Sequence, residues 1–329
     1  MDHDGLPPFG WSSFLTHWDV RLGWLVVGAL LVFAYVDAVI RGHQRGARMP
    51  GWRIACYLAG VVLLLLSVSS AIDVYAMSVF WVHMVQHLLL IMVVPMLLVV
   101  GHPLTAVRSA LGETGQRRFD AVVRSVPIAL LTHPIVSFAL YAVVIVGSHL
   151  TGFMDAMVVH GWLMPAEQVA YVVSGYLLLL PLMGREPIRW EVPYLARVLL
   201  VLLAMMPDTI VGIVLLQSDT VAFPKMFGMH PSWAPSALDD QQIAGGLMWA
   251  VGDGLMMVVG VVVVLAMIKD PNRVRVLGTW LESARRQAMT EHLAKGGGEQ
   301  EVLATDVDGD QAALDAYNAM LGRMSRHDG

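Results

Sequence analysis

The chain has 329 residues, of which 57% are apolar and only 14% carry a charge, and its mean hydropathy is +0.63. Soluble domains average about 25% charged residues, so this composition excludes a soluble globular protein and predicts one embedded in membrane lipid. The formal net charge of −5 argues against a nucleic-acid partner.

Seven apolar runs are long enough to cross a hydrocarbon core of ~30 Å, because a helix rises about 1.5 Å per residue. They are residues 22–40, 54–72, 79–100, 127–149, 169–183, 198–216 and 243–268. The fifth run is the shortest and spans only if residues 165–168 or Gly184 extend it. The sequence therefore predicts an all-α, polytopic membrane protein built as a seven-helix transmembrane bundle.

Basic residues alternate between the two sides of these runs. Arginine clusters occupy the first, third and fifth connections, and further Lys and Arg follow the last run, whereas the opposite side holds only Arg21 and Lys225. Because basic loops stay in the cytoplasm, we expect the N-terminus outside and the C-terminus in the cytoplasm.

Four segments are expected along the chain. An outer N-terminal segment (1–21) precedes the transmembrane domain (22–268). Apolar residues at helical spacing predict an interfacial amphipathic helix at 269–294, and a Gly-rich stretch opens a flexible cytoplasmic tail at 295–329.

The third run sets His83 and His87 into otherwise lipid-like sequence. Side chains four residues apart share one helix face, with Cβ atoms roughly 6 Å apart, so both imidazoles can reach one cation. Ionisable groups in spans are costly and mark ligand or proton sites. The alternative is a pair of histidines that only form interhelical hydrogen bonds.

Methionine is unusually frequent, at 21 residues, and several lie in loops on the outer side. The connection after the fourth run contains Met154, Met157 and Met164, which we expect to be exposed rather than packed. Thioether and imidazole groups together suit copper, with Cu(I) favoured over hard cations. Cys56 is the single cysteine, so any metal site must use other ligands.

Two acids lie near the middle of the last two runs. Asp208 follows Pro207 in the sixth run, and Asp253 lies in the seventh. A carboxyl group at that depth is protonated or paired. Each acid is interpreted either as a proton-carrying residue or as part of a hydrogen-bonded packing pair.

Four motifs carry a resemblance to a known family. They are HMVQHLLL followed by Pro and GHPL, SHLTGFMDA with His160 after it, SGYLLLLPLMG, and DQQIAGGLMW. In these the chain resembles cytochrome c oxidase assembly factors of the CtaG type (the caa3_CtaG family). The resemblance implies a seven-span chaperone of the bacterial plasma (inner) membrane that binds and supplies copper to a haem-copper oxidase. Its implied partners are the oxidase catalytic subunit or a copper chaperone, besides membrane lipid.

The predicted copper ligands lie in one outer layer if the third, fourth and fifth runs are neighbours. They are His83, His87, His149 and His160. Carboxylates can orient such imidazoles by accepting their second N–H, and the candidates are Asp73, Glu167, Asp240 and Asp253. Many relatives carry a histidine where this chain has Gln168, which removes one ligand from the set.

Two other functions remain open at this stage. A haem-b-binding electron carrier would use His87, His102, His133 and His149, but the inner pair lies at proline-disrupted helix ends, so haem is disfavoured. A copper or proton-coupled transporter would use Asp208 and Asp253. The sequence shows no nucleophile beside a base and no phosphate-binding loop, so it does not predict an enzyme.

Overall fold

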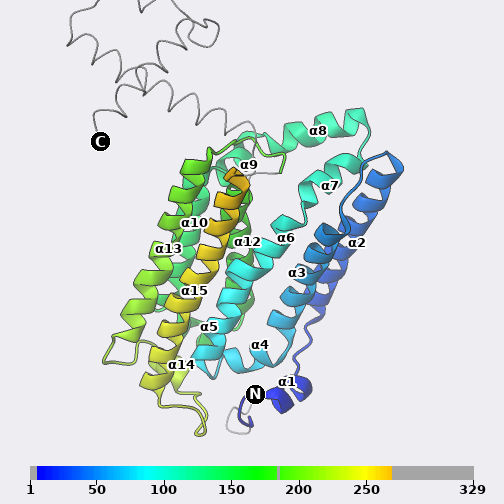
Figure 1. Cartoon of the computed structure of the whole chain (residues 1–329). Helices are drawn as coiled ribbons and strands as arrows, with labels where there is room; N and C mark the ends of the chain where they lie inside the picture. The colour runs from blue at the N-terminus through cyan, green and yellow to red at the C-terminus, as the bar shows by residue number, and fades with distance from the viewer. Residues whose placement is uncertain (1–5, 184–185, 269–329) are drawn as a thin grey trace, which may run out of the picture. The chain divides into compact units, whose positions relative to one another are not determined.

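The structure is a computed structural model that describes residues 6–183 and 186–268 (Figure 1). Within these two ranges every regular element is a helix and none is a strand, which confirms the predicted all-α class. A short helix, α1 (Trp11–Thr16), lies in the N-terminal segment. The predicted amphipathic helix at 269–294 and the tail at 295–329 lie outside the described residues.

Six spans are continuous enough to cross a bilayer by their length and composition in the described part of the chain. They are α2 (Leu22–Gln44), α3 (Gly51–Ser69), the succession Phe80–Ala110, α12 (Leu163–Met183), α13 (Tyr194–Leu216) and α15 (Ala237–Ile268). The fifth predicted run reaches spanning length because α12 begins at Leu163 and includes residues 165–168, as the sequence required.

The seventh candidate span is broken. The predicted helix 127–149 is divided into α9 (Val126–Leu131) and α10 (Pro134–His149), because His133 precedes Pro134 and such a residue is biased away from helical backbone angles. After α10 the chain bends by 66° into α11 (Phe153–Val159). The fold therefore has six spans, or seven if this bent pair counts as one.

The third span is irregular around its proline, Pro95. It consists of α5 (Phe80–Leu88), a π-helical turn η2 (Leu89–Val93), α6 (Val94–Val100) and α7 (Pro103–Ala110). Pro95 has no N–H to donate to the carbonyl of Ile91. Gly175 of α12 lies directly against that carbonyl, where any Cβ would collide with it. This contact fixes how α12 lies against the helix that carries His83 and His87.

The described helices pack as a bundle around a buried apolar core. α2 contacts α3 and α7, and α3 contacts α6; α12 lies against η2 and α6 on one side and against α10 on the other, and α10 contacts α13. α13 and α15 approach closely, because a Cβ on Gly212 would lie 2.9 Å from the carbonyl oxygen of Gly245. Small residues allow such contacts between membrane helices.

The two ends of the bundle differ in chemistry (Figure 1). The arginine-rich loops gather with α7, α8 (Glu113–Val123) and α9 at one end, which we call the basic end. The other end holds α4 (Ala71–Ala76) and α14 (Pro224–Phe227), and we call it the histidine end. The predicted alternation of charge is therefore present, while the side of the membrane that each end faces stays a prediction.

Candidate metal centre

Three of the four predicted histidines meet near the histidine end of the bundle. His83 and His87 come from α5, and His149 is the last residue of α10. The ring centroid of His149 lies 6.0 Å from that of His83 and 4.9 Å from that of His87. All three side chains are at most 2% exposed. We call these three residues the histidine cluster.

The cluster contains buried nitrogen atoms without partners. Both ring nitrogens of His83, both of His87, and Nε2 of His149 have no hydrogen-bond partner. Leaving a buried polar atom unsatisfied costs about 1–3 kcal/mol, so folded proteins rarely retain several together. Several unpaired buried nitrogen atoms are therefore expected at a site where a bound ligand supplies the missing contacts.

The tautomer of His149 is fixed by its own helix. Its Nδ1 lies 3.0 Å from the carbonyl oxygen of Ile145 and 2.8 Å from the hydroxyl of Ser148. Because a carbonyl oxygen can only accept, Nδ1 carries the proton and Nε2 has a free lone pair. This is the arrangement in which a backbone carbonyl orients an imidazole for metal binding.

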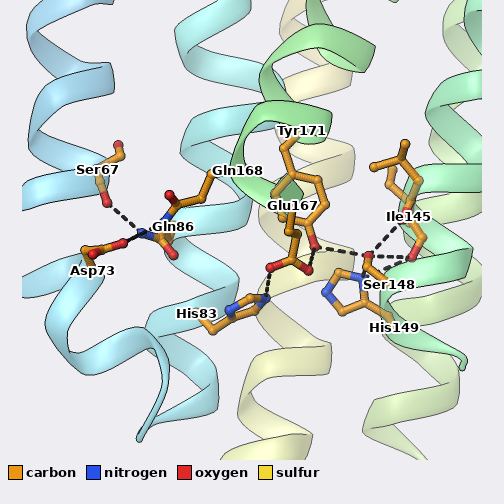
Figure 2. A network of polar contacts seen from close by, with 11 residues as sticks. Ser67, Asp73, His83, Gln86, Ile145, Ser148, His149, Glu167, Gln168 and Tyr171 are labelled. Atoms are coloured by element: carbon orange, nitrogen blue, oxygen red, sulfur yellow. Dashed lines mark hydrogen bonds and ion pairs between the residues drawn. The ribbon is translucent and has the colours of Figure 1, made fainter. Parts of the chain in front are cut away.

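Glu167 lies beside the cluster, held from its own helix (Figure 2). Its Oε2 is 3.9 Å from Nε2 of His83, and its Oε1 accepts a hydrogen bond of 2.6 Å from the hydroxyl of Tyr171. That hydroxyl is also 3.0 Å from Oγ of Ser148, and the Tyr171 ring packs edge-on against His87 at 4.3 Å. Of the predicted carboxylates, Glu167 therefore stands where it can accept a proton from His83 or help to hold a cation.

The cluster is not a preformed coordination shell. Within residues 6–183 and 186–268, no group of three or more His, Cys, Asp or Glu side chains is already arranged to hold a metal ion. The chemistry of the donors nevertheless fits copper, because imidazole nitrogens suit this metal and these carry no competing hydrogen bonds. Binding would require the imidazoles to turn toward a shared centre.

The fourth predicted histidine and the loop methionines are not part of the histidine cluster. His160 is exposed at the end of α11. Met154, Met157 and Met164 are only 0%, 1% and 7% exposed, so the expectation that they are exposed is wrong. The chain bends after α10 and packs these thioethers into the apolar core, where methionine fills irregular gaps. Their part in copper binding stays a prediction.

Asp73 lies at the centre of a second polar group, which we call the aspartate network (Figure 2). Its Oδ1 accepts from the side-chain amides of Gln86 at 2.8 Å and Gln168 at 2.6 Å, and its Oδ2 pairs with Arg21 at 2.9 Å. The hydroxyl of Ser70 caps α4, which leaves the Asp73 carboxylate free for these contacts. Burial raises the pKa of Asp73, while Arg21 and both amides act in the opposite direction.

Asp240 holds the start of the helix that bears the cluster. Its carboxylate accepts from the backbone N–H groups of Phe80 at 2.7 Å and Trp81 at 2.8 Å, and it lies 3.0 Å from Nε2 of His230. The first N–H groups of a helix lack partners within the helix and attract negative charge. Asp240 of α15 therefore fixes the N-terminus of α5, two turns before His87.

The histidines invoked for haem have other surroundings. Nδ1 of His133 accepts from the backbone N–H of Ile135, and its ring packs against Trp190 at 4.6 Å. His102 directly precedes α7 with a left-handed φ of 53° and is 6% exposed. His87 and His149 touch edge to face, which leaves no slot for a porphyrin between them.

Sequence reasoning missed several partners of the site. Tyr171 lies one turn after Glu167 on the same helix face, and Ser148 directly precedes His149, so their spacing could have indicated them. Gln86, Gln168 and Arg21 could not be assigned, because glutamine amides and an arginine at the start of a span have many alternative partners in a sequence.

Together these features define a class: a polytopic helical membrane protein with a buried imidazole cluster near one end. A profile of the family described as cytochrome c oxidase caa3 assembly factor (Caa3_CtaG) matches residues 33–270. The chain belongs to this family.

Curated relatives are mycobacterial. Uncharacterized proteins of Mycobacterium leprae, over 350 aligned positions, and Mycobacterium bovis, over 346, are each 27% identical to this chain. Both alignments cover 95% of this chain and 49% of the relative, so the chain spans about half the length of the curated relatives it matches. No solved structure matches the chain.

Proposed function

We propose that this protein assists the assembly of a haem-copper cytochrome c oxidase by binding copper at His83, His87 and His149, and passing it on. Membership of the assembly-factor family supports the first part. The observation that carries the second part is the set of five buried imidazole nitrogens without partners. Neutral imidazole in an apolar site suits Cu(I) better than a hard divalent cation.

The remaining details of the proposal concern placement and partners. With the basic end in the cytoplasm, the cluster lies toward the outer face of a bacterial inner membrane. Copper would then arrive from, or pass to, a copper chaperone or the oxidase catalytic subunit. Glu167 and Tyr171 would keep the imidazoles oriented.

The direct test is copper content of the detergent-purified full chain after loading with Cu(I). We expect near-stoichiometric copper in the parent, and an affinity loss of more than about a hundredfold in the His83→Ala, His87→Ala double variant, since losing even an orienting partner costs about 10–100-fold. His43→Ala, which removes an exposed histidine of α2, is the matched control and should bind as the parent does.

Unchanged copper stoichiometry and affinity in the double variant would place the site elsewhere. A Soret band in the purified protein would instead favour haem. His160→Ala, measured in the same series, decides whether an exposed fourth histidine contributes, and His149→Ala provides the comparison.

A cellular measurement tests the assembly role separately. In a host that lacks the chain, the parent gene should restore assembled oxidase, and the double variant should not. Restoration by a variant that binds no copper would leave assembly to protein contacts alone and overturn the copper part of the proposal.

A further inference from the structure

A third polar site, besides the histidine cluster and the aspartate network, lies between α10, α13 and α15. Asp208 of α13 is fully buried, and its Oδ2 accepts a hydrogen bond of 2.5 Å from the hydroxyl of Tyr141. Asp253 of α15 accepts a hydrogen bond of 2.8 Å from Thr209 through Oδ2. In both carboxyl groups the other oxygen, Oδ1, is buried and has no hydrogen-bond partner.

The two acids belong to one site because each lies against the neighbour of the other. A Cβ on Gly252 would be 3.7 Å from Cγ of Asp208, and Asp253 is the next residue. Thr209, which donates to Asp253, directly follows Asp208.

No positive charge balances this pair among the helix segments around it. The described helices α10, α12 and α15 contain no Lys or Arg, and Arg197 of α13 lies about three turns from Asp208. The groups that face the pair are Tyr141 on α10, Tyr171 on α12 and Leu88 on α5. None of these side chains supplies a cation.

We propose that Asp208 and Asp253 form an intramembrane proton-binding site that holds at least one exchangeable proton. Two ionised carboxylates without a cation are costly inside a membrane, and carboxyl groups that share a site retain a proton between them. The partnerless Oδ1 atoms are the positions at which this proton can reside. None of the three histidines of the cluster belongs to this site, although Tyr171 lies beside both.

Proton occupancy would act on the contact between α13 and α15. These helices touch through Gly212 and Gly245, so their backbones have little room to separate the two acids. Loss of the proton places two negative charges on facing helices in a medium of low dielectric constant. The protonated form therefore stabilises the close contact, and the deprotonated form loosens it.

The test is infrared spectroscopy of the full chain in lipid vesicles at neutral pH, in H2O and in D2O. We expect a carbonyl stretching band of a protonated carboxylic acid that shifts on transfer to D2O and disappears in Asp208→Asn or Asp253→Asn. Asp37→Asn is the matched control, because Asp37 is an acid in α2 that pairs with Arg41 at 2.8 Å and should contribute no such band.

Tyr141→Phe keeps the test decisive if the aspartate variants do not fold. Removing the hydroxyl that donates to Oδ2 should shift the band without abolishing it. The proposal is overturned if the band is unchanged in both aspartate variants, if it does not respond to D2O, if it is unchanged in Tyr141→Phe, or if added Na+ removes it, which would indicate a cation site.

Discussion

The histidine cluster and the aspartate network share helix α5, and α12 carries a neighbour of each, yet the two groups have opposite chemistry. On α5, His83 and His87 face the cluster while Gln86 faces Asp73; on α12, Glu167 faces His83 while Gln168 faces Asp73. In the aspartate network three partners converge on one carboxylate. In the histidine cluster five nitrogens have no partner at all.

Under the proposed function, this difference separates a part that holds the structure from a part that would bind a ligand. Most polar atoms of the aspartate network are paired, although Oε1 of Gln168 is buried without a partner. Paired buried networks rigidify a fold, whereas unsatisfied polar atoms cost stability and persist at functional sites. Adjacent residues on one helix can therefore serve opposite purposes, since they point in different directions. The stability of three variants tests this difference in role between the two groups.

The largest expected effect is in the aspartate network. Asp73→Ala should lower the free energy of unfolding by about 3 kcal/mol, because it leaves Gln86 and Gln168 without their acceptor in a buried site. Arg21 adds less, since its side chain is 34% exposed. Thermal unfolding of the purified chain measures this, and the folded fraction at low temperature should still bind copper. A loss below 0.5 kcal/mol, on the order of a surface substitution, would contradict the structural role.

In the histidine cluster, a substitution is expected to raise the free energy of unfolding instead of lowering it. His87→Leu should stabilise the metal-free protein by about 1 kcal/mol, because it replaces two partnerless buried nitrogens by an apolar side chain of similar size. The same variant should lose copper binding. Thermal unfolding with and without Cu(I) measures both effects. Destabilisation as large as that of Asp73→Ala would mean that the imidazoles hold the structure.

The smallest expected effect is a change in how the free energy of unfolding depends on pH. Because burial raises the pKa of Asp73 above its usual 3.8, the folded state binds more protons than the unfolded state in that range. The stability of the parent should therefore fall as pH rises from about 3.8 toward neutrality. Asp73→Asn, which keeps the shape but cannot ionise, should lack this decrease. If stability changes with pH equally in parent and variant, Arg21 fully offsets the effect of burial on the pKa of Asp73.

The motifs and spans could be predicted from local sequence, but the connections between them could not. The spacing of His83 and His87 predicted two imidazoles on one helix face, and both are buried in α5, while their role as ligands stays a prediction. The prediction that Met154 and Met157 are exposed was wrong, because the bend of 66° after α10 is decided by packing rather than by composition. The link from Asp240 to the start of α5 joins residues 160 positions apart, which no local pattern reveals.

The sequence by itself determined that this is a helical membrane protein of the assembly-factor family, since hydropathy and motif spacing are local properties. It also indicated imidazole and thioether groups, which have the chemistry that the proposed copper site needs. Only the tertiary structure decided that His83, His87 and His149 share one buried site while His160 is exposed, and that Asp208 lies against Asp253. The physical reason is that helix crossing and rotation depend on distant contacts, such as Gly175 against the Ile91 carbonyl and Gly212 against Gly245.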